Sequence, residues 1–230
     1  MKKISIIIPV YNERETLKEI IEKVESASFC GLEKELIFVN DCSTDGSDEI
    51  LKEYENKYQV YNHLVNQGKG AAIRTALKHV SGDIVVIQDA DLEYDPVDYE
   101  KLLPLLLDNK ADVVYGSRFL QNQGNGSFML THYLGNKVLT LITNLLFNVT
   151  LTDMETCYKA FKSEFIKDVE IVSNRFDFEP EITAKIVKKG ARIKEVPVSY
   201  YGRLHAEGKK ITWKDGIHAI KALIKFRFEK

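Results

Sequence analysis

Residues 82–96 read GDIVVIQDADLEYDP, and this stretch decides the expected fold. The apolar run 84–87 does not alternate with polar residues, which is typical of a strand buried on both faces. The carboxylates of Asp89, Asp91 and Glu93 follow it. A chain that leaves a buried strand into clustered acids has reached an open rim. In open parallel sheets, ligands bind at that rim, outside the carboxyl ends of the strands.

The spacing of Asp89 and Asp91 indicates a metal site. Two carboxylates two residues apart repel one another unless a cation lies between them. Their hard oxygens suit Mg²⁺ or Mn²⁺, which take further ligands from water and phosphate. The alternative is a solvated acidic turn, because Asp is common in turns. The position directly after a fully apolar strand favours the metal site.

Length and composition restrict the classes of protein to which this chain can belong. The 230 residues fit one large α/β domain, with or without a tail, and 44% hydrophobic residues can form a substantial core. The net charge of −2 argues against a nucleic-acid binder. Cys30, Cys42 and Cys157 show no metal-site spacing, which favours a reducing, cytoplasmic compartment. We expect neither a secretory signal nor a membrane-spanning helix, so the protein would be soluble or peripheral.

The periodicity predicts alternating strands and helices in the first half of the chain. Strands are expected at 4–10, 35–40, 61–65, 84–88 and 112–117. Helical patterns separate them, which predicts a mostly parallel sheet with helices on both faces. Further helices are expected at 132–148, from 178 and from 213, and a strand at 192–201. We therefore predict an α/β domain at 1–202, followed at 203–230 by a basic loop and an amphipathic helix.

Polar residues follow each predicted parallel strand. In chain order they are Tyr11 and Glu13, Asp41, Lys69 within Gly68-Lys69-Gly70, Asp89-Ala90-Asp91, and Arg118. Parallel strands end at one edge of a sheet, so these groups should converge. Together they suit a nucleotide-diphosphate ligand.

Individual roles follow from side-chain chemistry. Tyr11 can cover a base, and Asp41 can accept hydrogen bonds from a base or ribose. Arg118, Arg203 and Lys210 are candidates for phosphate charge. Ordinary structural roles, without ligand binding, are the alternative for some of these motifs. The GKG segment lacks P-loop spacing and could be a flexible helix start, Glu13 could be an ordinary first-turn acid, and Lys210 could lie on a solvated face.

The ordered motifs IIIPVYNE, VNDCSTDGS, NQGKGAA, DADLE and GSR resemble the family 2 glycosyltransferases of GT-A fold, a Rossmann-like α/β domain. Within that family the chain is most similar to the dolichol-phosphate mannose synthases and related polyprenyl-phosphate glycosyltransferases. TDMETCYKAF and RLHAEGKK extend the resemblance, which covers roughly residues 3–210.

The resemblance implies transfer of a hexose from a nucleotide-sugar donor, GDP-mannose or UDP-glucose, with inversion at the anomeric carbon. It implies that Pro9, Tyr11, Glu13 and Asp41 hold the nucleotide. Lys69 and Asp89-Ala90-Asp91 would complete the donor site, with Asp89, Asp91 and Glu93 at the Mg²⁺ or Mn²⁺ ion. Arg118, Arg203 and Lys210 would bind the phosphates.

The acceptor stays open between a polyprenyl phosphate and a glycan or protein hydroxyl. A lipid phosphate is already anionic, whereas a hydroxyl needs a general base, for which Asp153 or Glu155 is the candidate. Residues 203–230 hold eight Lys and Arg against three Asp and Glu. With an apolar helix face, that charge suits an anionic membrane surface. Packing against the core or a dimer partner is the alternative.

Three further possibilities concern class and partners. A sugar-nucleotide pyrophosphorylase should carry a Gly-rich loop after its first strand, where this chain has PVYNERE. A non-catalytic nucleotide-binding subunit is also compatible with the motifs. A homo-oligomer or a separate membrane subunit is left open.

Overall fold

The structure, a computed structural model, describes residues 1–120, 130–203 and 213–229, with the side chains at 130–132 and 213–215 excluded. The strands are β1 (Lys3–Val10), β2 (Glu33–Asn40), β3 (Gln59–Asn62), β4 (Ile84–Ile87), β5 (Val113–Ser117), β6 (Lys159–Lys162) and β7 (Ile193–Pro197). The helices are α1 (Arg14–Ser26), α2 (Ser47–Lys52), α3 (Lys69–Leu77), η1 (Pro96–Asp98), α4 (Tyr99–Leu107), α5 (Leu130–Phe147), α6 (Ser163–Ile166), α7 (Phe178–Lys188) and α8 (Trp213–Phe228).

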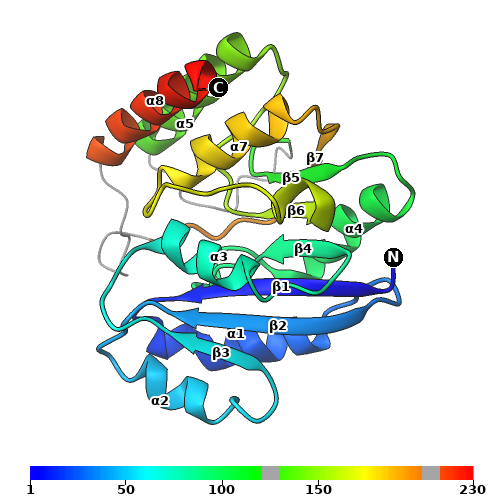
Figure 1. The fold of residues 1–230 in the computed structure, drawn as a ribbon, viewed down its shortest axis with the longest axis vertical. Helices are drawn as coiled ribbons and strands as arrows, with labels where there is room; N and C mark the ends of the chain where they lie inside the picture. Colours follow the sequence, from blue (N-terminus) through cyan, green and yellow to red (C-terminus); the bar gives the residue numbers. More distant parts are fainter. Residues whose placement is uncertain (121–129, 204–212, 230) are drawn as a thin grey trace.

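One seven-stranded sheet organises the molecule, in the order β3-β2-β1-β4-β6-β5-β7 (Figure 1). Every pairing is parallel except those of β6, which runs antiparallel to both β4 and β5. The predicted α/β class with a mostly parallel sheet is confirmed. The predicted strand at 61–65 is displaced, because β3 pairs with β2 over Gln59–Asn62.

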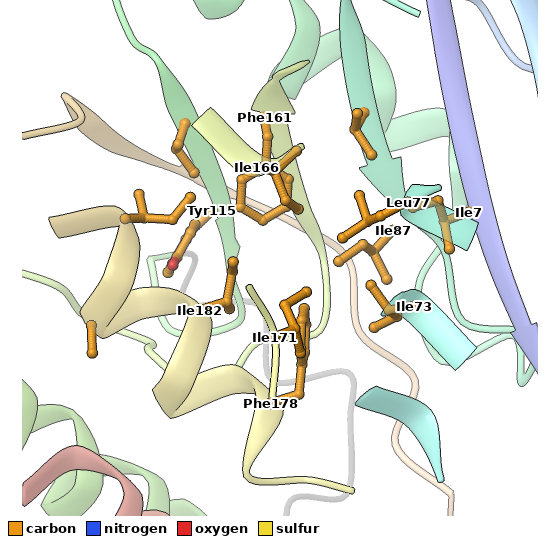
Figure 2. Packing of buried hydrophobic residues seen from close by; sticks show 14 of the residues in the cluster. Ile7, Ile73, Leu77, Ile87, Tyr115, Phe161, Ile166, Ile171, Phe178 and Ile182 are labelled. Atoms are coloured by element: carbon orange, nitrogen blue, oxygen red, sulfur yellow. The ribbon is translucent and has the colours of Figure 1, made fainter. Parts of the chain in front are cut away.

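Two apolar clusters cover the two faces of the sheet. In β1, Ile7 faces one cluster and Ile6 and Ile8 face the other, as the strand period of two requires. The Ile7 side includes residues of α3, α5, α7 and α8, part of which Figure 2 shows. The opposite side includes residues of α1 and α4. Apolar side chains therefore cover both faces of the sheet, which explains why residues 84–87 are all apolar.

Helix α8 joins the same core. It contacts α7 and α5, and Leu223 and Phe226 are buried against them. In Figure 1 α8 lies beside α5, beyond the sheet edge formed by β7. None of the helices in the described part of the chain combines the length and hydropathy needed to cross a bilayer.

The direction of β6 positions the functional edge. Strands β1, β2, β4 and β5 end at this edge, whereas the antiparallel β6 begins there. Residues 153–158, which lead into β6, are therefore brought beside the residues that follow the parallel strands. We call this edge, with the residues that flank it, the strand-end rim.

Candidate active site

The acidic motif after β4 lies at the rim, but its three carboxylates do not share one role. Within the described residues, no three His, Cys, Asp or Glu side chains converge on a common metal position. The two Glu93 oxygens accept hydrogen bonds from the Tyr200 hydroxyl at 2.9 Å and the Arg203 N–H at 2.8 Å. These contacts anchor the segment after β7, and a role for Glu93 as a third metal ligand stays a prediction that would require exchange of them.

Asp89 and Asp91 remain as a pair of hard oxygen donors. Burial raises the pKa of Asp91 to about 8, and the negative charges of Asp89 and Glu93 add to the effect more than Arg203 offsets it. A carboxyl under such repulsion lacks a compensating cation. The carboxylate oxygens of Asp89 and Asp91 fit a divalent cation that takes its other ligands from a diphosphate and water.

Lys69 bridges two elements at the rim. Its Nζ lies 2.8 Å from Asp89 Oδ1 and 3.3 Å from Glu179 Oε1, in the first turn of α7. Burial alone would lower the pKa of Lys69, but Asp89, Cys157 and Glu179 outweigh it and hold the pKa well above its usual value. Lys69 is therefore a buried cation beside Asp89 and Asp91.

Asp41 orders the loop that carries Lys69. Its carboxylate accepts hydrogen bonds from the N–H groups of Gln67 at 2.9 Å and Gly68 at 2.6 Å. His63 Nδ1 lies 2.7 Å from Asp41 Oδ1, and its Nε2 lies 2.9 Å from the Thr75 hydroxyl. Contact between Asp41 and a nucleotide stays a prediction, since its oxygens already serve this loop.

Arg203 and Glu13, which are both predicted donor ligands, bind each other. Arg203 Nη1 donates to Glu13 Oε2 at 2.8 Å, and its Nε and Nη2 donate to the Asp91 carbonyl. This places a guanidinium directly beside the acidic motif. Its role as a phosphate ligand stays a prediction, and it would require exchange of these contacts.

Arg118 and Asp153 form a buried, bidentate ion pair. Asp153 is fully buried, and Nε and Nη2 of Arg118 each donate to it at 2.7 Å. The Arg118 guanidinium also lies over the Tyr200 ring, 5.2 Å from its centroid. Glu195 of β7 accepts hydrogen bonds from the N–H groups of Thr152 and Asp153, which holds the acid in place. Asp153 thus neutralises Arg118, and acting as a base would require opening this pair.

Glu155 differs from its neighbour Asp153. Its Oε1 is buried and has no hydrogen-bond partner among the described residues. Burial and the Glu179 charge raise the pKa of Glu155 to about 8, against the opposing effect of Lys159 and Arg118. A carboxyl with a raised pKa and an uncommitted oxygen can exchange a proton with a bound group.

The remaining predicted residues are placed as follows. Pro9 lies within β1 beside Val39, and Tyr11 is half-buried just after β1. Ala90 is buried, and its carbonyl accepts a hydrogen bond from Thr16 at 2.8 Å. Lys210 lies outside the described residues.

Sequence reasoning missed Glu179, His63, Lys159 and Glu195. Glu179 stands at the start of a helix, where acids are common for dipole reasons, so its sequence position carries no functional signal. Lys159 is buried in β6, where it donates to the Met154 and Thr156 carbonyls and covers the Tyr115 ring. Their roles depend on contacts between distant segments.

The structure is an α/β domain with charged residues gathered at the strand-end rim, and a family model gives the assignment. The model for glycosyl transferase family 2 matches residues 5–170. The chain therefore belongs to glycosyl transferase family 2, and it is a glycosyltransferase that uses a nucleotide-sugar donor.

Curated relatives agree with this family. A dolichol-phosphate mannosyltransferase of Pyrococcus furiosus is 29% identical over 211 residues, which cover 90% of this chain and 59% of that protein. Glycosyltransferase AglJ of Haloferax volcanii is 28% identical over 204 residues, covering 87% of this chain and 63% of that protein. The chain thus spans less than two thirds of the length of these two relatives.

Solved structures share the fold. Glucosyl-3-phosphoglycerate synthase from Mycobacterium tuberculosis, in complex with Mn²⁺, uridine diphosphate and phosphoglyceric acid, superposes with a TM-score of 0.72. It is 19% identical, and the match covers 99% of this chain and 79% of that one. Staphylococcus aureus TarS with UDP-GlcNAc gives a TM-score of 0.64 at 22% identity, covering 98% of this chain and 67% of that one.

Proposed function

We propose that the chain transfers a hexose, mannose or glucose, from a nucleoside-diphosphate donor to a polyprenyl phosphate, with inversion and with Mg²⁺ or Mn²⁺. The observation that carries the proposal is the pair of Asp89 and Asp91 at the end of β4, where Lys69 pairs with Asp89 while burial and neighbouring carboxylates raise the pKa of Asp91 to about 8. The similarity to a dolichol-phosphate mannosyltransferase supports the lipid acceptor.

Asp89 and Asp91 would hold the metal ion, which, when bound, offsets the negative charge of the departing nucleoside diphosphate. The chain supplies further positive charge from Lys69, Arg118 and Arg203. Carboxylates hold all three cationic groups at the rim, and Lys69 and Arg203 would exchange these contacts to face the leaving group. Positive charge placed close to the leaving group stabilises the transition state.

The outer surface of α5 and α8 supports an acceptor held in a membrane. The two helices contact each other and carry apolar side chains that are 44–76% exposed: Leu134, Val138, Leu141 and Leu145 of α5, with Ile217, Ile224 and Phe228 of α8. We call this set the outer apolar face. The exposed Lys221, Lys225 and Arg227 flank it on α8. Apolar residues bordered by cations suit peripheral binding to an anionic, cytoplasmic membrane face.

The second candidate keeps the donor chemistry and changes the acceptor to a glycan or protein hydroxyl. The uncommitted Glu155 oxygen favours it, because a hydroxyl nucleophile needs a base. A polyprenyl phosphate has no such need near neutral pH.

The test is transfer of label from GDP-mannose or UDP-glucose to polyprenyl phosphate in the presence of Mn²⁺. We expect a lipid-linked product that chelation of the metal abolishes. Asp91→Asn should lower kcat/KM at least ~100-fold, since metal stabilisation of the transition state amounts to several kcal/mol. Asp48→Asn on α2 removes an exposed carboxylate away from the motif and is the matched control. Label reaching only soluble glycan or protein acceptors would select the second candidate instead.

A further inference from the structure

The ammonium group of Lys69 lies between two acids of different character. One is Asp89, a member of the proposed metal pair, and the other is Glu179, which lies outside that pair. The three side chains are 11%, 14% and 4% exposed, so solvent screens their charges weakly. Lys69 can therefore lose its contact with Asp89 while keeping a buried counter-ion.

The two glycines of the GKG motif create this arrangement. Gly68 has φ of +98°, and a Cβ there would come well inside 3.0 Å of the Asn174 carbonyl oxygen. A Cβ at Gly70 would collide in the same way with the Ser173 carbonyl oxygen. The start of α3 thus lies directly against the segment that precedes α7. This close approach brings Lys69 within reach of Glu179.

The Asp89 carboxylate cannot bind the Lys69 ammonium and a divalent cation at full strength at the same time. A metal ion bound by Asp89 and Asp91 would repel the nearby ammonium, and the ammonium neutralises one of the two metal ligands while it stays. Glu179 offers Lys69 a second partner at 3.3 Å, so the ammonium does not become an unpaired buried charge when it leaves Asp89.

We propose that Lys69 is an internal competitor for the metal site, and that Glu179 is the positioning residue which draws it away when the metal binds. The proposal rests on the metal dependence proposed above. In the metal-free protein Lys69 neutralises Asp89. In the loaded protein it pairs with Glu179, beside the donor diphosphate. The strength of the Lys69–Glu179 pair then sets the affinity for the metal.

The experiment measures Mn²⁺ affinity directly, from the electron paramagnetic resonance signal of free Mn²⁺, first alone and then with GDP or UDP. In the absence of nucleotide, Lys69→Met should tighten Mn²⁺ binding by about 10-fold, and Glu179→Gln should weaken it several-fold, because couplings of contacting groups are of order 0.5–3 kcal/mol. The double variant should resemble Lys69→Met, since Glu179 acts through Lys69. Lys78→Met and Glu164→Gln make the same charge changes at exposed positions and should leave the affinity unchanged.

A purely structural role for Lys69 predicts a different pattern. Both single variants would then weaken Mn²⁺ binding, and melting temperatures would fall in parallel, which would overturn the inference while leaving metal dependence intact. Equal effects of Glu179→Gln with and without Lys69 would also overturn it. Absence of Mn²⁺ binding by the unmodified protein under every condition would instead remove the proposed metal-dependent function, and the inference with it.

Discussion

The Arg118 guanidinium and the Asp153 carboxylate meet through two parallel hydrogen bonds, each 2.7 Å long. The Arg118 N–H also donates to Asp153, at 3.0 Å. These contacts join the end of β5 to the segment that leads into β6. Because Asp153 is fully buried, it is the counter-ion that allows a guanidinium to be fixed at the rim.

Removal of Asp153 should destabilise the fold as well as the site. Asp153→Ala leaves a buried guanidinium without its carboxylate, and we expect a loss of about 3–5 kcal/mol in the free energy of unfolding. Urea denaturation measures this loss. Asp108→Ala breaks an exposed pair with Lys110 and should change stability by less than about 0.5 kcal/mol. Equal, small effects of the two substitutions would contradict the counter-ion role.

Glu155 should impose a pH dependence whose form depends on the acceptor. With a pKa of about 8, Glu155 is mostly protonated at neutral pH. If it is the base for a hydroxyl acceptor, turnover should rise as pH increases through about 8, and Glu155→Gln should abolish the rise. Transfer to a lipid phosphate should show no such rise from this group. Initial rates of the unmodified protein and of Glu155→Gln, measured between pH 6 and 9, decide between the hydroxyl and the lipid-phosphate acceptor.

The same raised pKa predicts an effect on stability. The unfolded carboxyl ionises near its ordinary value, so the folded protein loses stability as pH rises from about 4.5 to 8. Glu155→Gln removes that loss. We therefore expect the variant to gain stability relative to the unmodified protein over this range, as measured by thermal melting at several pH values. A constant difference across the range would show that Glu155 titrates normally.

Gly68 should tolerate no side chain. Gly68→Ala combines a left-handed φ of +98° with a collision against the Asn174 carbonyl, so we expect a loss of at least about 2 kcal/mol together with weaker nucleotide binding. Gly135→Ala is the control, since a Cβ there meets nothing within 4 Å and the residue lies inside α5. It should stabilise the protein by up to about 1 kcal/mol. Chemical denaturation and nucleotide titration report both effects.

Glu35 should contribute to resistance against acid. Burial raises the pKa of Glu35, but hydrogen bonds from Lys3, Ser5 and Ser81 outweigh burial and lower it to about 2. Its stabilising effect is therefore present above about pH 4.5 and is lost as pH falls towards 2. Glu35→Gln should be less stable than the unmodified protein at pH 6, and the difference should shrink towards pH 2. Glu33→Gln, exposed on the same strand, should show no such trend.

The outer apolar face should govern binding to lipid. Leu141→Glu with Leu145→Glu places two charges where these leucines are 57% and 76% exposed. We expect at least about 10-fold weaker binding to vesicles of anionic phospholipid, since burying a Leu side chain contributes about 1.5–3 kcal/mol. Leu64→Glu is the control, because Leu64 is 94% exposed and follows β3 at the opposite edge of the sheet. If all variants bind vesicles equally in sedimentation, the outer apolar face is not the lipid-binding surface.

The sequence predicted the parallel part of the fold because its signals are local. A strand covered on both faces must be apolar throughout, and 84–87 shows that pattern without reference to any other segment. The acids after β4 and Arg118 after β5 follow from the rule that parallel strands end at one edge. The strand β6 was missed because it has four residues with lysine at each end. Lys162 can be buried there because Asp112 pairs with it at 2.8 Å and Asn109 accepts a second hydrogen bond from its ammonium group.

The amino-acid sequence by itself thus determined the succession of strands and helices in the first half and the chemical types at the rim. Tertiary structure decided which of these groups pair. Arg203 pairs with Glu13, which lies 190 residues away in the sequence, and Lys69 at the start of α3 pairs with Glu179 in α7. It also reversed β6, which placed Asp153 and Glu155 at the strand-end rim, and it brought Tyr200 and Arg203 against both Glu93 oxygens. Hydrophobic periodicity records whether a residue is buried, whereas ion pairing depends on which distant segments the core brings together.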